Sequence, residues 1–191
     1  MPMYQPPTLL RQLPKRWLPW VAGAVLALVL VLGTARWLVD QQLAANGEEE
    51  GENWVSFVLQ GVPSLEEGLR MGRFGDVARE QLRLLSTADE VFRFRLLNQQ
   101  GRLVVDSRTL GAPEGAPLPA HADDALALTV LADGRKRVRI YHDDAEGIEG
   151  VEHYCVALLP IVVDGRRIGV FEVFIDQSER AEGLERAFLL L

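Results

Sequence analysis

The sequence predicts an α+β protein in which an N-terminal transmembrane helix precedes a five-stranded antiparallel sheet flanked by helices. Three observations predict this class. Residues 17–35 contain no charge, later segments alternate apolar and polar side chains between turn signals, and helical patterns lie on both sides of those segments. With 191 residues, 48% apolar and 25% charged, the chain is long enough for one ordinary domain and an appendage.

The charge of the chain is unevenly divided. Residues 1–39 hold four basic side chains and no acid, so residues 40–191 hold 16 basic against 27 acidic side chains. The negative charge of residues 40–191 repels the phosphate backbone of nucleic acids, and we therefore expect no nucleic acid partner. Cys155 is the only cysteine, which excludes an intrachain disulfide, a zinc finger and a thiol redox pair.

The uncharged segment predicts a helix that crosses a lipid bilayer. Nine of the nineteen residues in 17–35 are Leu or Val, and together they favour insertion by about 3 to 5 kcal/mol. This length spans the hydrocarbon core of a membrane. Basic residues lie before it, so residues 1–16 are predicted to be cytoplasmic, residues 17–39 transmembrane and residues 40–180 periplasmic. The Arg-rich composition suggests a bacterium, and hence its inner membrane.

A cleaved signal peptide is the alternative for this segment. Leu43-Ala44-Ala45 could serve as a poor cleavage site of small residues. The apolar part of a signal peptide is usually shorter, and Arg36 with Trp37 fits badly just before a cleavage point. The sequence therefore favours a retained anchor.

Helical patterns continue after the apolar segment. Residues 38–45 and 54–59 predict a long juxtamembrane helix with Gly47 and Gly51 as candidate break points. The acidic patch Glu48–Glu50 between them predicts a solvated face rather than a calcium site.

Two short helices should follow. The spacing of Ser64 and Glu67 is that of a capping box opening one of them. Asp76 should begin the other, whose inner face we expect to carry Val77, Leu84 and Leu85.

Alternation with a period of two begins at Val91. Phe92, Phe94 and Leu96 should face one side of a strand while Arg93 and Arg95 face the other. Residues 98–101 turn the chain into a second strand at 103–106. Residues 111–119 contain five Gly or Pro and predict a loop, after which Asp123-Asp124 can cap a helix that runs through Val130.

Three more strands complete the predicted sheet, at residues 136–142, 153–162 and 168–175. Asp164-Gly165 between the last two is a strong signal for a two-residue hairpin turn. The Asp176 to Glu179 spacing then opens a last helix, and residues 181–191 are predicted to be an exit helix that begins a second transmembrane helix.

This order of elements resembles the extracytoplasmic PAS-like sensor called a Cache or PDC domain. Two regions carry the resemblance: the first hairpin at Phe92–Ser107 (FRFRLLNQQGRLVVDS), and the closing hairpin at Tyr154–Ile161 (YCVALLPI) with Asp164–Ser178 (DGRRIGVFEVFIDQS). The resemblance covers roughly residues 40–185. It implies the signal-sensing part of a bacterial transmembrane receptor, held between two membrane helices.

The resemblance also implies a kind of output. Sensors of this style are frequent ahead of GGDEF and EAL domains, which make and break down cyclic-di-GMP, and nothing resembling those domains is present in this sequence. A histidine kinase or a chemoreceptor is the alternative output. Such outputs generally act as dimers, so a homodimer is expected, although the sequence shows no sustained heptads.

The sequence contains no recognisable catalytic constellation. The three histidines show no His-x-x-x-His spacing, and no Gly-x-Ser-x-Gly elbow is present, so we predict no catalytic residues, no cofactor and no assigned metal ligands. His142-Asp143-Asp144 with Glu152-His153 could converge on a cation if their strands pair. A solvated loop is the favoured interpretation of those residues.

Two short motifs each have a simple structural interpretation. Gly72-Arg73-Phe74-Gly75 has the spacing of a KH-type backbone clamp, but its acidic setting favours a break between two helices. The basic cluster at residues 135–139 is expected to be a solvated sheet face, with recognition of anions or acidic headgroups as the alternative.

The PAS-like class implies a cavity between the sheet and the loop-helix segment before the third strand. Arg139 and Tyr141 should share the face opposite Val138 and Ile140, and Tyr154 could lie across from them. A guanidinium and phenols could hold a carboxylate, so these three residues are the predicted site for a small anionic ligand. The alternatives are a domain that senses a partner protein or the membrane, a membrane-anchored periplasmic scaffold or inhibitor, and an exported enzyme with unrecognised residues.

Overall fold

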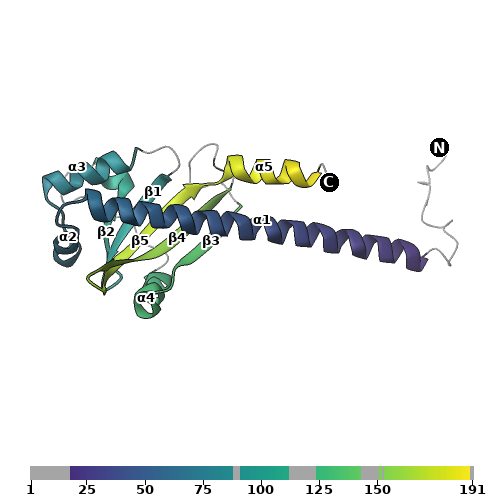
Figure 1. Ribbon diagram of the computed structural model, residues 1–191, viewed down its shortest axis with the longest axis horizontal. Coiled ribbons are helices and arrows are strands. Elements are labelled where there is room, and N and C mark those ends of the chain that lie inside the picture. The colour runs from purple at the N-terminus through teal and green to yellow at the C-terminus, as the bar shows by residue number, and fades with distance from the viewer. Residues whose placement is uncertain (1–17, 88–90, 112–123, 143–150, 152, 190–191) are drawn as a thin grey trace, which may run out of the picture. The chain divides into compact units, whose positions relative to one another are not determined.

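A computed structural model describes residues 18–87, 91–111, 124–142, 151 and 153–189 of the chain. The chain divides into two compact units, residues 1–38 and 39–191. Helices and one antiparallel sheet make up the second unit, which confirms the predicted α+β class (Figure 1).

Helix α1, Leu18–Gly61, contains every described residue of the predicted membrane-spanning segment, residues 17–39. The most apolar stretch of this helix has a mean hydropathy of 2.0, and none of that stretch is buried. Among the described residues, α1 is the one helix long and apolar enough to cross a membrane, judged by length and composition.

Within the second unit α1 continues without a break, so the expectation of an interruption at Gly47 or Gly51 was wrong. Both glycines are buried against strand residues. A Cβ atom at Gly47 would lie 2.4 Å from the Cys155 Sγ, and one at Gly51 would lie 2.7 Å from the Leu159 Cδ1. The glycines therefore allow the helix to approach the sheet closely, and that packing compensates for their low helix propensity.

Helices α2, Leu65–Met71, and α3, Asp76–Leu85, occur where the sequence predicted them. The capping box was wrong, because Ser64 has a positive φ of 56° and its side chain makes no capping hydrogen bond. The inner face of α3 was also misassigned. Of the three residues expected there only Leu85 is buried, whereas Val77 is 69% and Leu84 52% exposed.

The sheet consists of β1 Val91–Asn98, β2 Leu103–Asp106, β3 Arg137–Tyr141, β4 Tyr154–Val163 and β5 Arg166–Asp176. The strand order is β2-β1-β5-β4-β3, and every neighbouring pair is antiparallel. The predicted turn at Asp164-Gly165 is present, with positive φ angles of 49° and 72° that suit a tight hairpin.

The two faces of the sheet are covered differently. Helices α1, α2 and α3 pack on one face through a core that includes Leu69, Leu82 and Phe171. Helix α4, Asp124–Asp133, packs on the other face through Ala127 and Val130 (Figure 1). We call these the α1 face and the α4 face.

Helix α5, Ser178–Leu189, leaves the end of β5 and returns along α1. The Asp176 carboxylate accepts a 2.9 Å hydrogen bond from the Ser178 N–H, which begins the helix at the predicted place. Val39 and Leu43 of α1 pack with Ala181 of α5. Last, Glu50 of α1 pairs with Arg180 and accepts a 3.2 Å hydrogen bond from the Gln177 side chain.

Candidate ligand-binding face of the sheet

The three predicted site residues lie on the α4 face. Tyr141 of β3 pairs in register with Tyr154 of β4, and their rings stack at 4.9 Å with an interplanar angle of 7°. Arg139 lies two residues before Tyr141 and is exposed. Val138 and Ile140 pack into the core of the α1 face, as the alternation predicted. The structure thus brings the two tyrosines together and places Arg139 on the same face, without testing what they bind.

An aromatic row continues across the sheet from these tyrosines. The Phe92 ring lies 5.7 Å from the Tyr154 ring and 6.0 Å from the Phe174 ring, both edge-on. We call Tyr141, Tyr154, Phe92 and Phe174 the aromatic row. Its aromatic surface can contribute to binding through the faces and edges of the rings.

The position of Phe92 corrects the sequence analysis. Strict alternation placed it with Phe94 and Leu96, which do lie in the core of the α1 face. The β1–β5 register shifts between Val91 and Arg93, and this irregularity lets Phe92 join the arginine side of the strand. A bulge changes the side to which a residue points, and the alternation pattern alone does not reveal it.

Beside the aromatic row lies a buried group of charges that the sequence analysis missed. Arg93 contacts Asp106 through two nitrogens, at 2.6 and 3.3 Å. Arg95 contacts Asp106 at 3.2 Å and Glu172 of β5 at 3.3 Å. All four side chains are buried, and we call them the charge cluster. Two features of the sequence could have indicated this cluster. Asp106 is the last residue of a strand, and Glu172 lies in the middle of a strand that is otherwise apolar around it.

The charge cluster is stabilised by mutual pairing. Burying an ion costs several kcal/mol unless partners replace its water. Both guanidinium carbons also lie 5.2 Å from the centre of the Phe174 ring, a cation–π arrangement that joins the cluster to the aromatic row. Its two positive and two negative charges balance, so the cluster shapes the face without giving it a net charge.

Burial raises the pKa of the Asp106 carboxyl, but opposing contacts outweigh this effect. Hydrogen bonds from the Arg93 side chain and the Arg108 backbone, with the charge of Arg93, leave the pKa of Asp106 below its usual value. Asp106 is therefore ionised at neutral pH, and it orients both arginines.

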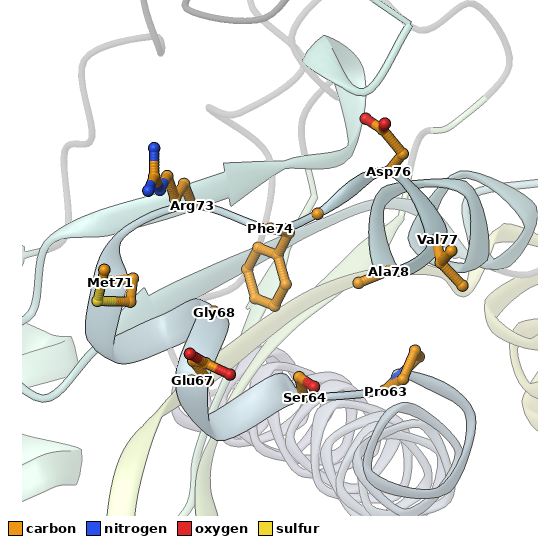
Figure 2. A pocket seen from close by; sticks show the side chains of 11 residues that line it. Pro63, Ser64, Glu67, Gly68, Met71, Arg73, Phe74, Asp76, Val77 and Ala78 are labelled. Carbon is orange, nitrogen blue, oxygen red and sulfur yellow. The ribbon is translucent and has the colours of Figure 1, made fainter.

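Arg139 and the aromatic row line neither of two cavities that open from the described part of the chain. The larger is an open groove of about 890 Å³ between α2 and α3. Figure 2 shows Met71, Arg73 and Asp76 around it, with the Phe74 ring packed toward Gly68. The Gly72–Gly75 motif therefore separates two helices, as predicted. Residues 111–119 were expected to form a loop that closes a cavity over the α4 face. Apart from Gly111, they lie outside the described residues.

The basic cluster at residues 135–139 is partly neutralised within the molecule. Lys136 of the α4–β3 connection pairs with Glu48, at 2.8 Å, and with Glu52, both on α1. Arg137 pairs with Asp133 at the end of α4. Part of the acidic patch that was expected to be solvated thus forms ion pairs with the α4–β3 connection and with α5.

Comparison with known proteins yields no matching family model and no matching curated relative. Solved structures that are similar to this chain include the following two. One is the ligand-binding domain of the Pseudomonas aeruginosa PAO1 amino acid chemoreceptor PctC in complex with GABA, 18% identical over 79% of this chain and 64% of that one, with a TM-score of 0.40. The other is a domain of a sensory box/GGDEF family protein from Vibrio parahaemolyticus, 18% identical over 76% of this chain and 61% of that one, with a TM-score of 0.33.

This chain therefore spans less than two thirds of either structure.

Proposed function

We propose that residues 40–180 form the signal-sensing domain of a bacterial membrane receptor, anchored in the inner membrane by residues 17–39 and located in the periplasm. The output regulates cyclic-di-GMP, with a histidine kinase or chemoreceptor output as the alternative. Residues 1–16 are then cytoplasmic, and α5 leads toward a second membrane helix.

One observation carries the proposal: strand β5 connects the candidate ligand face directly to the helix pair. Phe174 and Glu172 of β5 belong to the aromatic row and the charge cluster. Two residues after Phe174 the strand ends at Asp176, and α5 begins at Ser178. Since α5 packs on α1 through Ala181, Val39 and Leu43, a displacement of β5 changes the relation between the two helices.

Such a domain reports by favouring one arrangement of its helices over another. A ligand shifts that equilibrium only by its difference in affinity for the two arrangements, about 1 to 3 kcal/mol for typical coupling. The Glu50 contacts with Arg180 and Gln177 are the polar links that such a shift would alter. A homodimer through the juxtamembrane part of α1 would transmit it to an output.

The ligand class follows from the side chains of the α4 face. Arg139 offers a planar set of donors suited to a carboxylate, and Tyr141 and Tyr154 offer phenol groups beside it. We therefore assign recognition of a small anion to Arg139, Tyr141 and Tyr154.

A different observation favours a second candidate, a membrane-anchored scaffold or inhibitor. The groove between α2 and α3 is open, and Met71 and Val77 on its rim are 51% and 69% exposed. Apolar side chains exposed at a groove can receive a protein partner.

Thermal shift and calorimetry on the full chain in detergent micelles test the proposal, with acetate, succinate and GABA as probes. Arg139→Ala should weaken binding of a probe that binds the wild type by at least about tenfold, because a hydrogen bond to a charged group contributes about 1.5 to 3 kcal/mol. Arg102→Ala, at an exposed arginine of the β1–β2 turn, is the matched control and should bind normally.

Equal affinity of Arg139→Ala and the wild type for a bound probe would remove Arg139 from the site. If none of the three probes binds the wild type, the proposed carboxylate class is wrong and the scaffold candidate gains support.

A further inference from the structure

We propose that His142 and His153 form a binding site for a transition-metal dication of the zinc class. The site lies on the α1 side of the β3–β4 pair, where α1, the two strand ends and the first residues of α5 meet. It goes beyond the proposed function and does not depend on it.

The register of the sheet brings the two histidines together. Tyr141 and Tyr154 are paired, so the residues that follow and precede them lie opposite each other at the open end of the hairpin. The Nδ1 atoms of His142 and His153 are 3.1 Å apart, and their rings are inclined by 78°. The condition stated from the sequence, that these strands must pair, is met.

This separation is close to that of two imidazole ligands on one metal ion. Nitrogens bound at 2.0 to 2.1 Å to a tetrahedral Zn²⁺ lie about 3.3 Å from each other. The histidine pair would thus need to open by only a few tenths of an ångström. Without a metal, only one of the two facing nitrogens can carry a hydrogen, since two facing N–H groups would repel.

The other nitrogen of His142 lies near a carboxylate, as is usual for metal-bound imidazoles. Its Nε2 is 3.2 Å from the Asp40 Oδ1 of α1. That oxygen is buried and has no hydrogen bond to the described residues. A small rotation of the His142 ring onto a metal would direct its N–H at Asp40, which fixes the tautomer and increases the basicity of the ligating nitrogen.

The donor set decides the class of metal. Imidazole suits Zn²⁺, Cu²⁺ and Ni²⁺, whereas Ca²⁺ and Mg²⁺ prefer oxygen. Within the described part of the chain no third His, Cys, Asp or Glu completes a group around one point. The described residues therefore supply two ligand positions there, and Asp143, Asp144 and Glu152, which the sequence analysis grouped with these histidines, lie outside the described residues.

The backbone of His153 links this site to the start of α5. The His153 carbonyl accepts a 2.8 Å hydrogen bond from the Gln177 N–H, and its own N–H donates to the Ser178 Oγ at 3.2 Å. A bound ion would hold His142 and His153 together while Asp40 supports His142 from α1. Binding is thus expected to stabilise the junction of α1, the sheet and α5.

Isothermal titration of the full chain, without a histidine tag and stripped of metal by a chelator, tests the site with ZnCl₂ and with MgCl₂ for comparison. We expect saturable binding of zinc and none of magnesium. His142→Gln and His153→Gln should each weaken zinc binding at least tenfold, and Asp40→Asn about 10- to 100-fold. His121→Gln, at the third histidine of the chain, is the matched control and should bind as the wild type does.

Electron paramagnetic resonance of bound Cu²⁺ separates ligands from residues that merely hold the structure. The wild type should show coupling to two imidazole nitrogens, and each single variant coupling to one. Metal-free variants should melt at the wild-type temperature; if one does not fold, the wild-type spectrum still tests the proposal. No saturable zinc binding by the wild type, unchanged binding by a variant that carries both His142→Gln and His153→Gln, or a copper spectrum without two nitrogens would each overturn it.

Discussion

Among single residues, Asp106 links the two arginines of the buried charge cluster, since it contacts both Arg93 and Arg95. Asp106→Asn would leave two guanidinium groups in a buried site with one remaining acid, Glu172. We expect a loss of about 3 to 5 kcal/mol in the free energy of unfolding. Thermal unfolding followed by circular dichroism measures it, with Asp133→Asn, in an exposed ion pair with Arg137, as a control that should lower the melting temperature far less.

The same carboxyl predicts a dependence of stability on pH. Because the pKa of Asp106 is lower in the folded chain than its usual 3.8, its ionised form stabilises the fold at pH values above 3.8. That contribution should be lost as the pH falls from about 3.8 through the folded pKa. A melting temperature that depends on acid pH equally in the wild type and in Asp106→Asn would contradict this assignment.

Cys155 gives a second prediction at this scale. Burial, followed by the negative charge of Glu50, raises the pKa of its thiol to about 12, and the side chain is fully buried. The native chain should therefore not react with a thiol reagent such as DTNB at pH 8, because the thiolate is the reactive form. One thiol should react after denaturation. Rapid reaction of the native chain would mean that the α1–sheet contact opens readily.

Residue-level errors of the sequence analysis share one physical cause. The alternation and helical patterns describe a strand or a helix by itself, whereas the side taken by Phe92, Val77 and Leu84 depends on a strand irregularity and on which turn of α3 meets the core. Arg139 and Tyr141 were placed correctly because β3 is regular. The partners of Arg93 and Arg95 could not be identified, since Asp106 and Glu172 become their neighbours only through strand pairing.

At the scale of elements, the close contact of α1 with β4 depends on Gly47. A methyl group there would meet the Cys155 Sγ at 2.4 Å, so Gly47→Ala should destabilise the chain by about 1 to 3 kcal/mol despite its better helix propensity. Adding Cys155→Ala removes the sulfur and should restore part of the loss, since the remaining contact is 3.4 Å. The melting temperatures of the two single variants and the double variant measure this coupling.

Gly183→Ala in α5 is the matched control, because nothing lies within 4 Å of a Cβ atom there. It should be neutral or stabilising by up to about 1 kcal/mol. Additive effects of Gly47→Ala and Cys155→Ala would show that the two positions do not meet.

The order and type of the described elements were largely predictable, because each has a strong local signal: the uncharged segment, the Asp164-Gly165 turn, and the Asp176 start of α5. Predictions failed where packing overrides local preference. Glycine disfavours a helix by itself, yet α1 continues through Gly47 and Gly51 because β4 lies against them. Similarly, Ser64 has the spacing of a capping box but a positive φ.

At the scale of the whole molecule, the proposed function requires that the sheet and its helices lie outside the cytosol while the segment before α1 lies inside. The basic residues at 11–16, the uncharged residues 17–35 and the acidic body are the sequence features that support this orientation. A cleaved signal peptide would also export the body, but it would release the chain from the membrane.

Labelling of the full chain in intact bacterial cells with a membrane-impermeant maleimide tests this orientation most directly. In a Cys155→Ala background, Gln81→Cys on the exposed side of α3 should be labelled in intact cells, and the labelled chain should stay in membranes washed at alkaline pH. Gln12→Cys should be labelled only after the inner membrane is permeabilised. The account would be contradicted if Gln81→Cys were labelled only after permeabilisation, or if the alkaline wash released the labelled chain from the membranes.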